Sequence, residues 1–189
     1  YTGLLTLGHA GLVAIGGYTV GVLTLDPTVK QVSYLLVPPH SLIAQACWPF
    51  VPALLLGGVF TAIIGFLVAA PAVRLGGDYL AMVTLGFAEI IRLIIINVPS
   101  LANGAMGLRG IPLSVTLPGT WAAAIIVVFI LARLEKGTYG RAFKAVCEDE
   151  IASEALGINL YRHKMLAFVI SAFFIGIGGG LMASVLGTI

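Results

Sequence analysis

The hydrophobic positions of the chain fall into five long runs that shorter polar stretches separate. A helix needs about 20 mostly apolar residues to cross the hydrocarbon core of a bilayer. Four of the runs reach that length, and the fourth along the chain is shorter. The pattern predicts an all-α, polytopic transmembrane helical bundle, a single domain over 1–189 with about five spans. The predicted spans are residues 3–25, 50–73, 79–98, 119–134 and 165–186.

The composition also indicates a membrane protein. The chain is 59% hydrophobic and only 10% charged, whereas about a quarter of the residues of a soluble domain are charged. Its 24 glycines suit helices that pack closely in a membrane. The net charge of +2 gives no reason to expect nucleic acid as a partner. Because the chain starts at Tyr1 and ends within an apolar run, we expect it to be a fragment of a longer membrane protein.

The lysines and arginines between the spans predict which side of the membrane each loop faces, because cytoplasmic loops carry an excess of them. Loops 26–49 and 99–118 contain only Lys30 and Arg109, respectively. The other side of the membrane would carry Arg74, Arg133, Lys136, Arg141, Lys144, Arg162 and Lys164. The loop 135–164 is thus predicted to be cytoplasmic, and the other two loops to face outward.

The third predicted span contains a charged pair, Glu89 and Arg92, three residues apart and so on one face of a helix. Glu89 lies ten residues after Tyr79, about 15 Å into the span. This position is near the middle of a bilayer, where charges are costly. One interpretation is a pair that fixes helix packing. The other is a polar lining for the path of a zwitterionic or hydrogen-bonding solute, which Asn97 would extend toward the outer end.

No pattern in the chain indicates an enzyme or a metal site. His9 is a lone histidine in the first predicted span, and no second histidine or carboxylate lies at ligand spacing from it. The sequence contains neither a GxSxG nucleophile motif nor a GxxxxGK(S/T) phosphate loop. We therefore expect no catalytic residues, no bound metal and no cofactor held by this chain. If ATP drives the protein, another subunit hydrolyses it.

The predicted cytoplasmic loop contains the most polar stretch of the chain, residues 148–159. A helix could begin at Thr138 or Gly140, and Gly157 could end it, since a left-handed cap favours glycine. An apolar stripe at helical spacing would consist of Phe143, Cys147, Ile151, Ala155 and Ile158. The opposite face would carry Lys144, Glu148, Asp149 and Glu154. This pattern alone predicts an amphipathic connector exposed to water.

Four stretches resemble the M-type permease subunit of branched-chain amino acid ABC importers. They are residues 3–11 (GLLTLGHAG), 74–92 (RLGGDYLAMVTLGFAEIIR), 103–112 (NGAMGLRGIP) and 140–159 (GRAFKAVCEDEIASEALGIN). The resemblance covers essentially the whole chain in order. In the last stretch, Ala152, Ser153 and Gly157 match the EAA loop of importer permeases, while Ile151 stands where that loop has glutamate. The longer loop 26–49 is a second departure.

The resemblance implies a type-II-ABC-importer-like bundle in a bacterial-type inner (plasma) membrane. Such a permease forms its translocation path with a second, H-type permease and binds two ATPase subunits at its cytoplasmic face. A periplasmic binding protein delivers the amino acid to it. By the same resemblance, the ATPase-coupling helix would consist of Glu150, Ile151, Ala152, Ser153, Glu154, Ala155, Leu156 and Gly157. ATP would move this helix and rock the bundle between two access states; whether Glu150 or Glu154 orients it stays open.

Three other functions remain open at this point. A permease on a related bundle could carry urea, short amides or a sugar, which the chemistry of the sequence does not separate from amino acids. A secondary transporter or channel would need no ATPase, and Glu89 and Arg92 would then serve an ion or proton pathway. The third is a structural bundle protein without a transport role.

Overall fold

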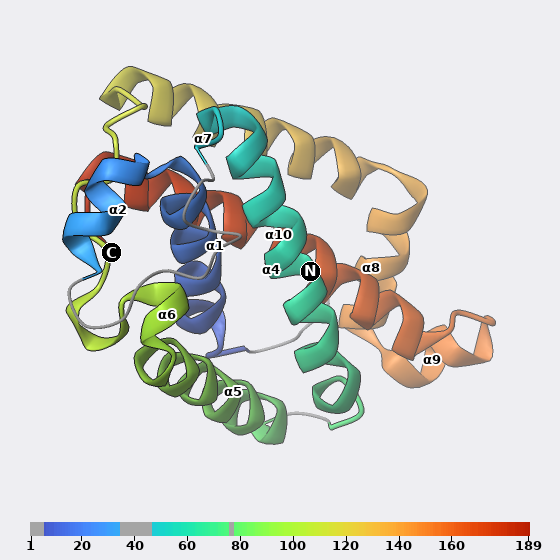
Figure 1. Cartoon of the computed structure of the whole chain (residues 1–189). Coiled ribbons are helices and arrows are strands. Elements are labelled where there is room, and N and C mark those ends of the chain that lie inside the picture. Colours follow the sequence, from blue (N-terminus) through green and yellow to red (C-terminus); the bar gives the residue numbers. More distant parts are fainter. Residues whose placement is uncertain (1–5, 35–46, 76–77) are drawn as a thin grey trace.

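The computed structural model describes residues 6–34, 47–75 and 78–189. Figure 1 shows a bundle of helices, and the described residues contain no strand beyond a single bridge between Arg109 and Thr188. The prediction of an all-α helical bundle is confirmed. The helices are α1 (His9–Thr24), α2 (Pro27–Ser33), α4 (Phe50–Ala72), α5 (Asp78–Asn97), α6 (Pro99–Ala102), the 3-10 turn η1 (Gly104–Met106), α7 (Leu117–Lys136), α8 (Thr138–Glu148), α9 (Glu150–Ala155) and α10 (Leu160–Leu186).

Among the described residues, four helices are long and apolar enough to cross a membrane: α4, α5 from Tyr79, α7 and α10. The first helix, α1, has only 16 residues. At about 24 Å it is shorter than the hydrocarbon core, which is about 30 Å thick. Over the described residues, the helix is therefore shorter than the predicted first span, 3–25. The helix begins at His9, after Gly8, and residues 3–5 lie outside the described residues.

The other helix ends differ from the apolar runs because polar residues also join the helices. α10 begins at Leu160, well before the predicted 165. It follows Asn159, whose side-chain oxygen accepts a hydrogen bond from the Arg162 N–H at 3.0 Å and so caps the helix. α7 extends beyond the predicted 119–134 at both ends. Hydropathy thus locates the part of a helix that suits lipid, and at α10 a side-chain cap sets where the helix begins.

Glycines bring α1, α4 and α10 into close contact at the centre of the bundle. A Cβ on Gly16 of α1 would overlap the backbone of Gly176 of α10, and a Cβ on Gly179 would overlap the Val13 carbonyl. A Cβ on Gly176 would lie 2.5 Å from the Thr61 Oγ1 of α4. Small residues let helix backbones approach closely in a membrane. These three helices form a core that has no room for larger side chains at these positions.

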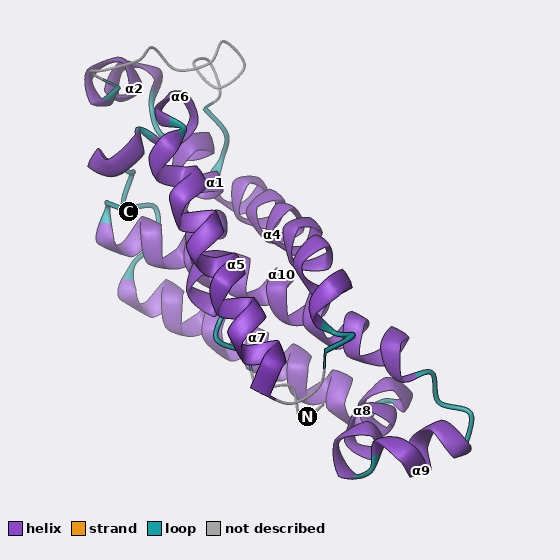
Figure 2. Ribbon diagram, turned by 90° about the horizontal axis from the view of Figure 1, so that it is seen from below, coloured by secondary structure: helices purple, strands orange, loops and turns teal. Residues whose placement is uncertain are grey.

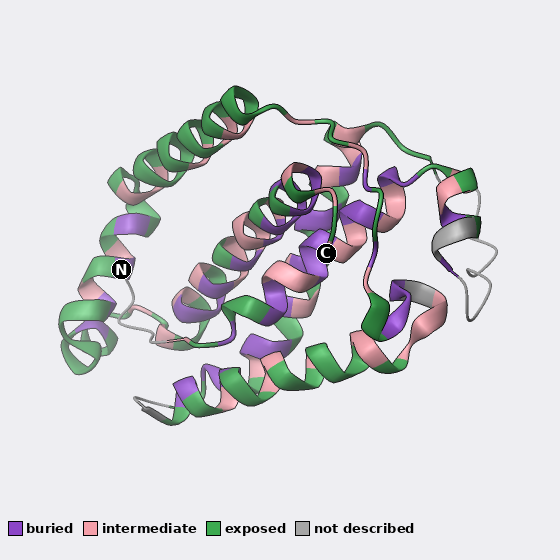
Figure 3. Ribbon diagram, turned by 90° about the vertical axis from the view of Figure 1, so that its left-hand side faces the viewer, coloured by how far each residue is buried: buried purple, intermediate pink, exposed green. Residues whose placement is uncertain are grey.

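The helices α5 and α7 lie at opposite edges of this core (Figures 1 and 3). α5 packs on the start of α1, where the Leu7 N–H donates to the Thr84 Oγ1 at 3.2 Å and Gly11 faces Ala88. α7 contacts mainly α8, and within the described part of the chain none of its residues is buried. The two edge helices are therefore the parts of the bundle that this chain covers least.

The connecting segments gather at the two ends of the bundle, with α2 and α6 at one end and α8 and α9 at the other (Figure 2). At the first end, segments 108–111 and 187–189 hold each other by backbone hydrogen bonds, and we call this pairing the clasp. The Leu108 N–H donates to the Ile189 carbonyl at 2.9 Å, and the Ile189 N–H donates to the Leu108 carbonyl at 3.0 Å. Leu108 and Ile111 are buried, so the predicted outer loop folds back onto the bundle.

Candidate functional site

Glu89 and Arg92 form an ion pair on the surface of α5. The Arg92 Nη2 donates to the Glu89 Oε1 at 2.6 Å, and the Arg92 Nε lies 3.1 and 3.0 Å from the two carboxylate oxygens. The side chains of Arg92 and Glu89 are 61% and 55% exposed. The three-residue spacing in the sequence predicts this contact. No described residue of the chain, however, supplies the cover that a buried packing pair would need.

The same side of α5 exposes a continuous surface around the pair. Met82, Leu85 and Leu93 are 68%, 54% and 46% exposed, and a Cβ on Gly86 would meet no described atom within 4 Å. Asn97 is exposed as well, and its Nδ2 donates to the Leu93 carbonyl at 2.8 Å, one turn back in the same helix. Charges in the middle of a span are costly against lipid tails. This face is therefore suited to water or to another protein.

Asp149 divides the predicted cytoplasmic helix in two. Its backbone is extended, with φ of −153°, between α8 and α9. Its side chain accepts a hydrogen bond from the Ala152 N–H at 3.0 Å, which caps the start of α9. The prediction of one helix as far as Gly157 is therefore wrong. Gly157 nevertheless adopts the predicted left-handed conformation, with φ of +84°, where a side chain would be strained.

The break also divides the predicted apolar stripe. Phe143 of α8 is 5% exposed, whereas Ile151 of α9 is 83% exposed. Leu156, directly after α9, is 81% exposed. Both exposed residues lie outside the candidate spans. Large apolar side chains that gather on a surface in water commonly mark an interaction site, so α9 presents a surface suited to a protein partner.

An ion pair joins α9 to the long helix α10. The Lys164 Nζ lies 2.6 Å from the Glu150 Oε1, and the Lys164 side chain is only 10% exposed. Glu150 thus contacts its own chain, while Glu154 is exposed. Ala152, Ala155 and Gly157 are exposed too, and Ser153 is buried. Most of the residues predicted for coupling therefore lie on an accessible surface, which α10 holds in place.

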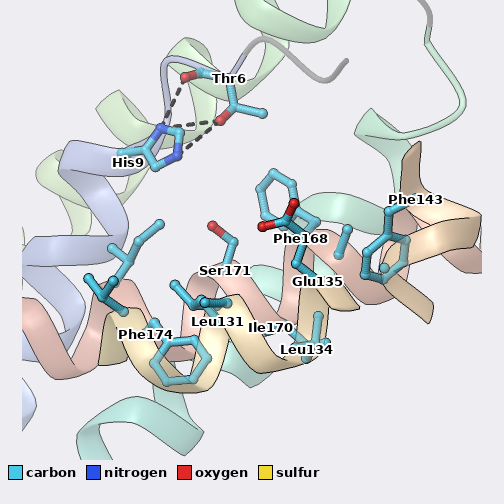
Figure 4. Close-up of a pocket in the computed structure, with 15 residues that line it drawn as sticks. Thr6, His9, Leu131, Leu134, Glu135, Phe143, Phe168, Ile170, Ser171 and Phe174 are labelled. Carbon is cyan, nitrogen blue, oxygen red and sulfur yellow. Dashed lines mark hydrogen bonds between the residues drawn. The ribbon is translucent and has the colours of Figure 1, made fainter. Parts of the chain in front are cut away.

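A cavity of about 840 Å³ lies between α7 and α10, beside the start of α1 (Figure 4). Its lining is mainly apolar, with Ser171 and Glu135 among its polar side chains. His9 also lines it, and its Nδ1 lies 3.0 Å from the Thr6 carbonyl oxygen. Among the described residues, no group of three histidine, cysteine, aspartate or glutamate residues could hold a metal ion. The ring of His9 is engaged with its own chain.

The clasp packs on a cluster of buried side chains at its end of the bundle. Tyr34 packs with Leu108 and Ile111. Burial raises the pKa of Tyr34 to about 12, with a smaller contribution from Tyr18. Burial also lowers the pKa of Lys30 of α2. The cluster under the clasp is buried and mainly apolar.

Comparison with known proteins decides the family. The whole chain, residues 1–189, matches the family described as "Branched-chain amino acid transport system / permease component". The chain belongs to this permease family. The resemblance carried by the four sequence stretches is confirmed. Together with the four apolar helices, it makes the chain part of a multi-pass membrane protein, and the family is one of transport permeases and not of enzymes.

Individual relatives of this permease agree. The chain is 34% identical to the "High-affinity branched-chain amino acid transport system permease protein LivM" of Salmonella typhimurium, over 97% of the chain and 47% of the relative. It is 25% identical to the "Probable branched-chain amino acid transport permease protein LivM" of Methanocaldococcus jannaschii, over 96% of the chain and 59% of the relative. It is 38% identical to the "Guanosine ABC transporter permease protein NupQ" of Bacillus subtilis, over 33% of the chain and 19% of the relative. The chain spans about half the length of the LivM relatives, and no solved structure matches it.

Three features of this permease component escaped the sequence reasoning. Asp149 begins a helix, which its place before a helix-forming stretch indicates by the usual rules for helix starts. Lys164 binds Glu150 although the two lie in different helices, and no local signal announces that pairing. The exposure of Leu156 depends on where α9 turns away from the bundle, and periodicity does not carry that information.

Proposed function

We propose that the chain is the core of a permease subunit in an ATP-driven importer of branched-chain amino acids. The match of the whole chain to the permease family carries this proposal, and the LivM relatives point to the solute. The complete importer would contain a second permease, two ATPase subunits and a periplasmic binding protein. It would lie in a bacterial-type inner membrane, with the end that carries α8 and α9 in the cytoplasm.

The surface around α9 is the proposed ATPase-coupling site. Ile151 and Leu156 would enter an apolar cleft of the ATPase, because their exposure is unfavourable in water. Glu150 would keep α9 on α10 through Lys164. Glu154, which is exposed, would then be the acidic residue that orients the helix in the cleft. ATP binding would move α9, and α10 would pass the movement to the bundle core.

The exposed face of α5 is the proposed contribution of this chain to the translocation path. Glu89, Arg92 and Asn97 lie on the uncovered side of α5, at an edge of the bundle. In a complex with the second permease, this edge would face the partner across the path. The pair would then lie in a polar environment and not in lipid, which its position in the middle of the span requires.

Substitutions on α9 test the coupling assignment in the full-length protein with its partner subunits, reconstituted in liposomes. Ile151→Asp and Leu156→Asp should abolish ATP-driven leucine uptake and reduce the ATPase that co-purifies, because a carboxylate has no place in an apolar cleft. Tyr139→Asp is the matched control, since Tyr139 is also an exposed large side chain at this end, 60% exposed. Bulky residues at Ala155 or Gly157 should act like the α9 variants. Normal uptake by all of them would refute the coupling role.

A panel of solutes and energy sources tests the function itself. Uptake of leucine, isoleucine and valine should depend on ATP and should persist when the proton gradient is removed. Uptake that survives ATP depletion and fails without the gradient would instead identify a secondary transporter. Preference for guanosine, urea or a sugar over leucine would keep the permease role and change the solute.

A further inference from the structure

We propose that Glu89 and Arg92 together form a docking site for the zwitterionic head group of the transported amino acid. The inference rests on the proposed function, because it takes an amino acid as the solute and α5 as part of the path. The carboxylate of the solute would bind Arg92, and its ammonium group would bind Glu89.

The position of the pair calls for a polar partner. Glu89 lies about 16 Å from the start of α5, in the middle of a candidate span. Both side chains are more than half exposed, and the described residues of the chain form no cover over them. Facing lipid tails at this depth would be costly for either charge. The site holds one positive and one negative side chain, so a solute with one charge of each sign can pair with both and leaves the net charge at zero.

The hydrogen-bond geometry leaves capacity on both partners. The Arg92 guanidinium has five N–H donors, and it approaches Glu89 through Nε and Nη2. Its remaining N–H groups lie on the outer edge of the fork, where a second carboxylate can bind by charge-assisted hydrogen bonds. The Glu89 carboxylate offers about four acceptor positions, so it can also accept from an ammonium group. The solute can therefore join the ion pair without breaking it.

The surroundings suit a small, branched aliphatic side chain. Gly86 lies one turn before Glu89 on the same face, and open space lies beside it in the described part of the chain. Leu85 directly precedes Gly86, Leu93 lies one turn beyond Glu89 on the same face, and both leucines are exposed. With the head group on the pair, the aliphatic part of the solute can lie over Gly86 against Leu85. A sugar would leave both charges without a match.

A packing role for the same pair makes different predictions. If Glu89 and Arg92 only pack against a helix of the second permease, replacing both with neutral side chains of similar size should be tolerated, because a well-packed neutral pair is often as stable as a desolvated ion pair. If they bind the solute, the same double substitution removes both contacts at once. The variant Glu89→Gln/Arg92→Gln separates the two roles and leaves no unpaired charge to disturb folding.

The test uses photo-leucine, a diazirine analogue of leucine, with the complete importer and its binding protein in lipid nanodiscs. Light during ATP turnover should label the α5 peptide, and excess leucine should suppress the labelling. In Glu89→Gln/Arg92→Gln the labelling should fall by about tenfold or more, the scale of losing a charge-assisted hydrogen bond, while the subunits still assemble. Glu135→Gln/Lys144→Gln, which neutralises the 2.6 Å ion pair between α7 and α8, is the matched control and should label like the wild type.

The wild-type importer separates failure of this inference from failure of the proposed function. If the wild type does not take up photo-leucine or leucine, the proposed solute is wrong and the site falls with it. If the wild type takes up leucine but α5 is not labelled, or if the double-neutral variant labels and transports like the wild type, the proposed function stands and the docking site is refuted.

Discussion

α5 and α7 are both apolar, edge-located helices of membrane-spanning length, yet they expose different chemistry. α7 carries large apolar side chains around its circumference and places its basic residues, Arg133 and Lys136, only in its last turn. α5 places Glu89 and Arg92 in its middle. Lipid tails satisfy the first kind of surface and not the second. A helix that its own chain leaves exposed can therefore face either lipid or another neighbour. A helix with charges only at its end suits lipid, whereas a helix with charges in its middle needs a polar or protein neighbour.

Of the substitutions that compare α5 with α7, an introduced charge should have the largest effect. Ile126→Glu on α7 puts a carboxylate against lipid at the middle of the helix, where a charge costs about 2.5–3.5 kcal/mol, and should strongly reduce the protein recovered from membranes. Leu85→Glu on the exposed face of α5 should reduce it much less. Quantifying membrane-inserted protein measures both, with Ile126→Leu as the control. Equal losses at the two sites would remove the distinction between the helices.

Added volume should have an intermediate effect. Gly86→Leu on α5 fills the open space beside the ion pair and should slow leucine uptake several-fold, about the effect of 1 kcal/mol, without lowering the amount of protein. Ala124→Leu adds similar volume to the exposed surface of α7, where lipid can move aside. Initial uptake rates at equal protein levels compare the two. If Ala124→Leu lowered the uptake rate more than Gly86→Leu, the path would lie beside α7 and not beside α5.

Weakening the attachment of α7 should have the smallest effect. The Lys144 Nζ lies 2.6 Å from the Glu135 Oε1 and ties α8 to the end of α7, with the two side chains 51% and 27% exposed. Exposed ion pairs contribute only about 0–1 kcal/mol, so Lys144→Gln should shift the melting temperature in detergent by a few degrees at most. If Lys144→Gln reduced the protein recovered from membranes as much as Ile126→Glu does, α7 would depend on this contact and not on lipid.

The sequence predicts the helices well because hydropathy is a local property, and α4, α5, α7 and α10 all lie over apolar runs. It predicts their ends less well, since Asn159 and Asp149 act through caps that hydropathy does not register. The contact between Glu89 and Arg92 follows from helical spacing alone. Its exposure does not, because that depends on how Gly11 and Ala88 pack α5 against α1, and such packing between distant segments leaves no pattern along the chain.

The ends of α10 give the clasp a further significance. One end of this helix holds α9 through the pair of Lys164 and Glu150, and its other end leads to Gly187, whose carbonyl accepts hydrogen bonds from two residues of the clasp. The helix has 27 residues and is about 40 Å long, with unbroken backbone hydrogen bonding that resists compression. Because the helix is stiff, the displacement of α9 that we propose on ATP binding would reach the clasp at the opposite end of the bundle through this single helix.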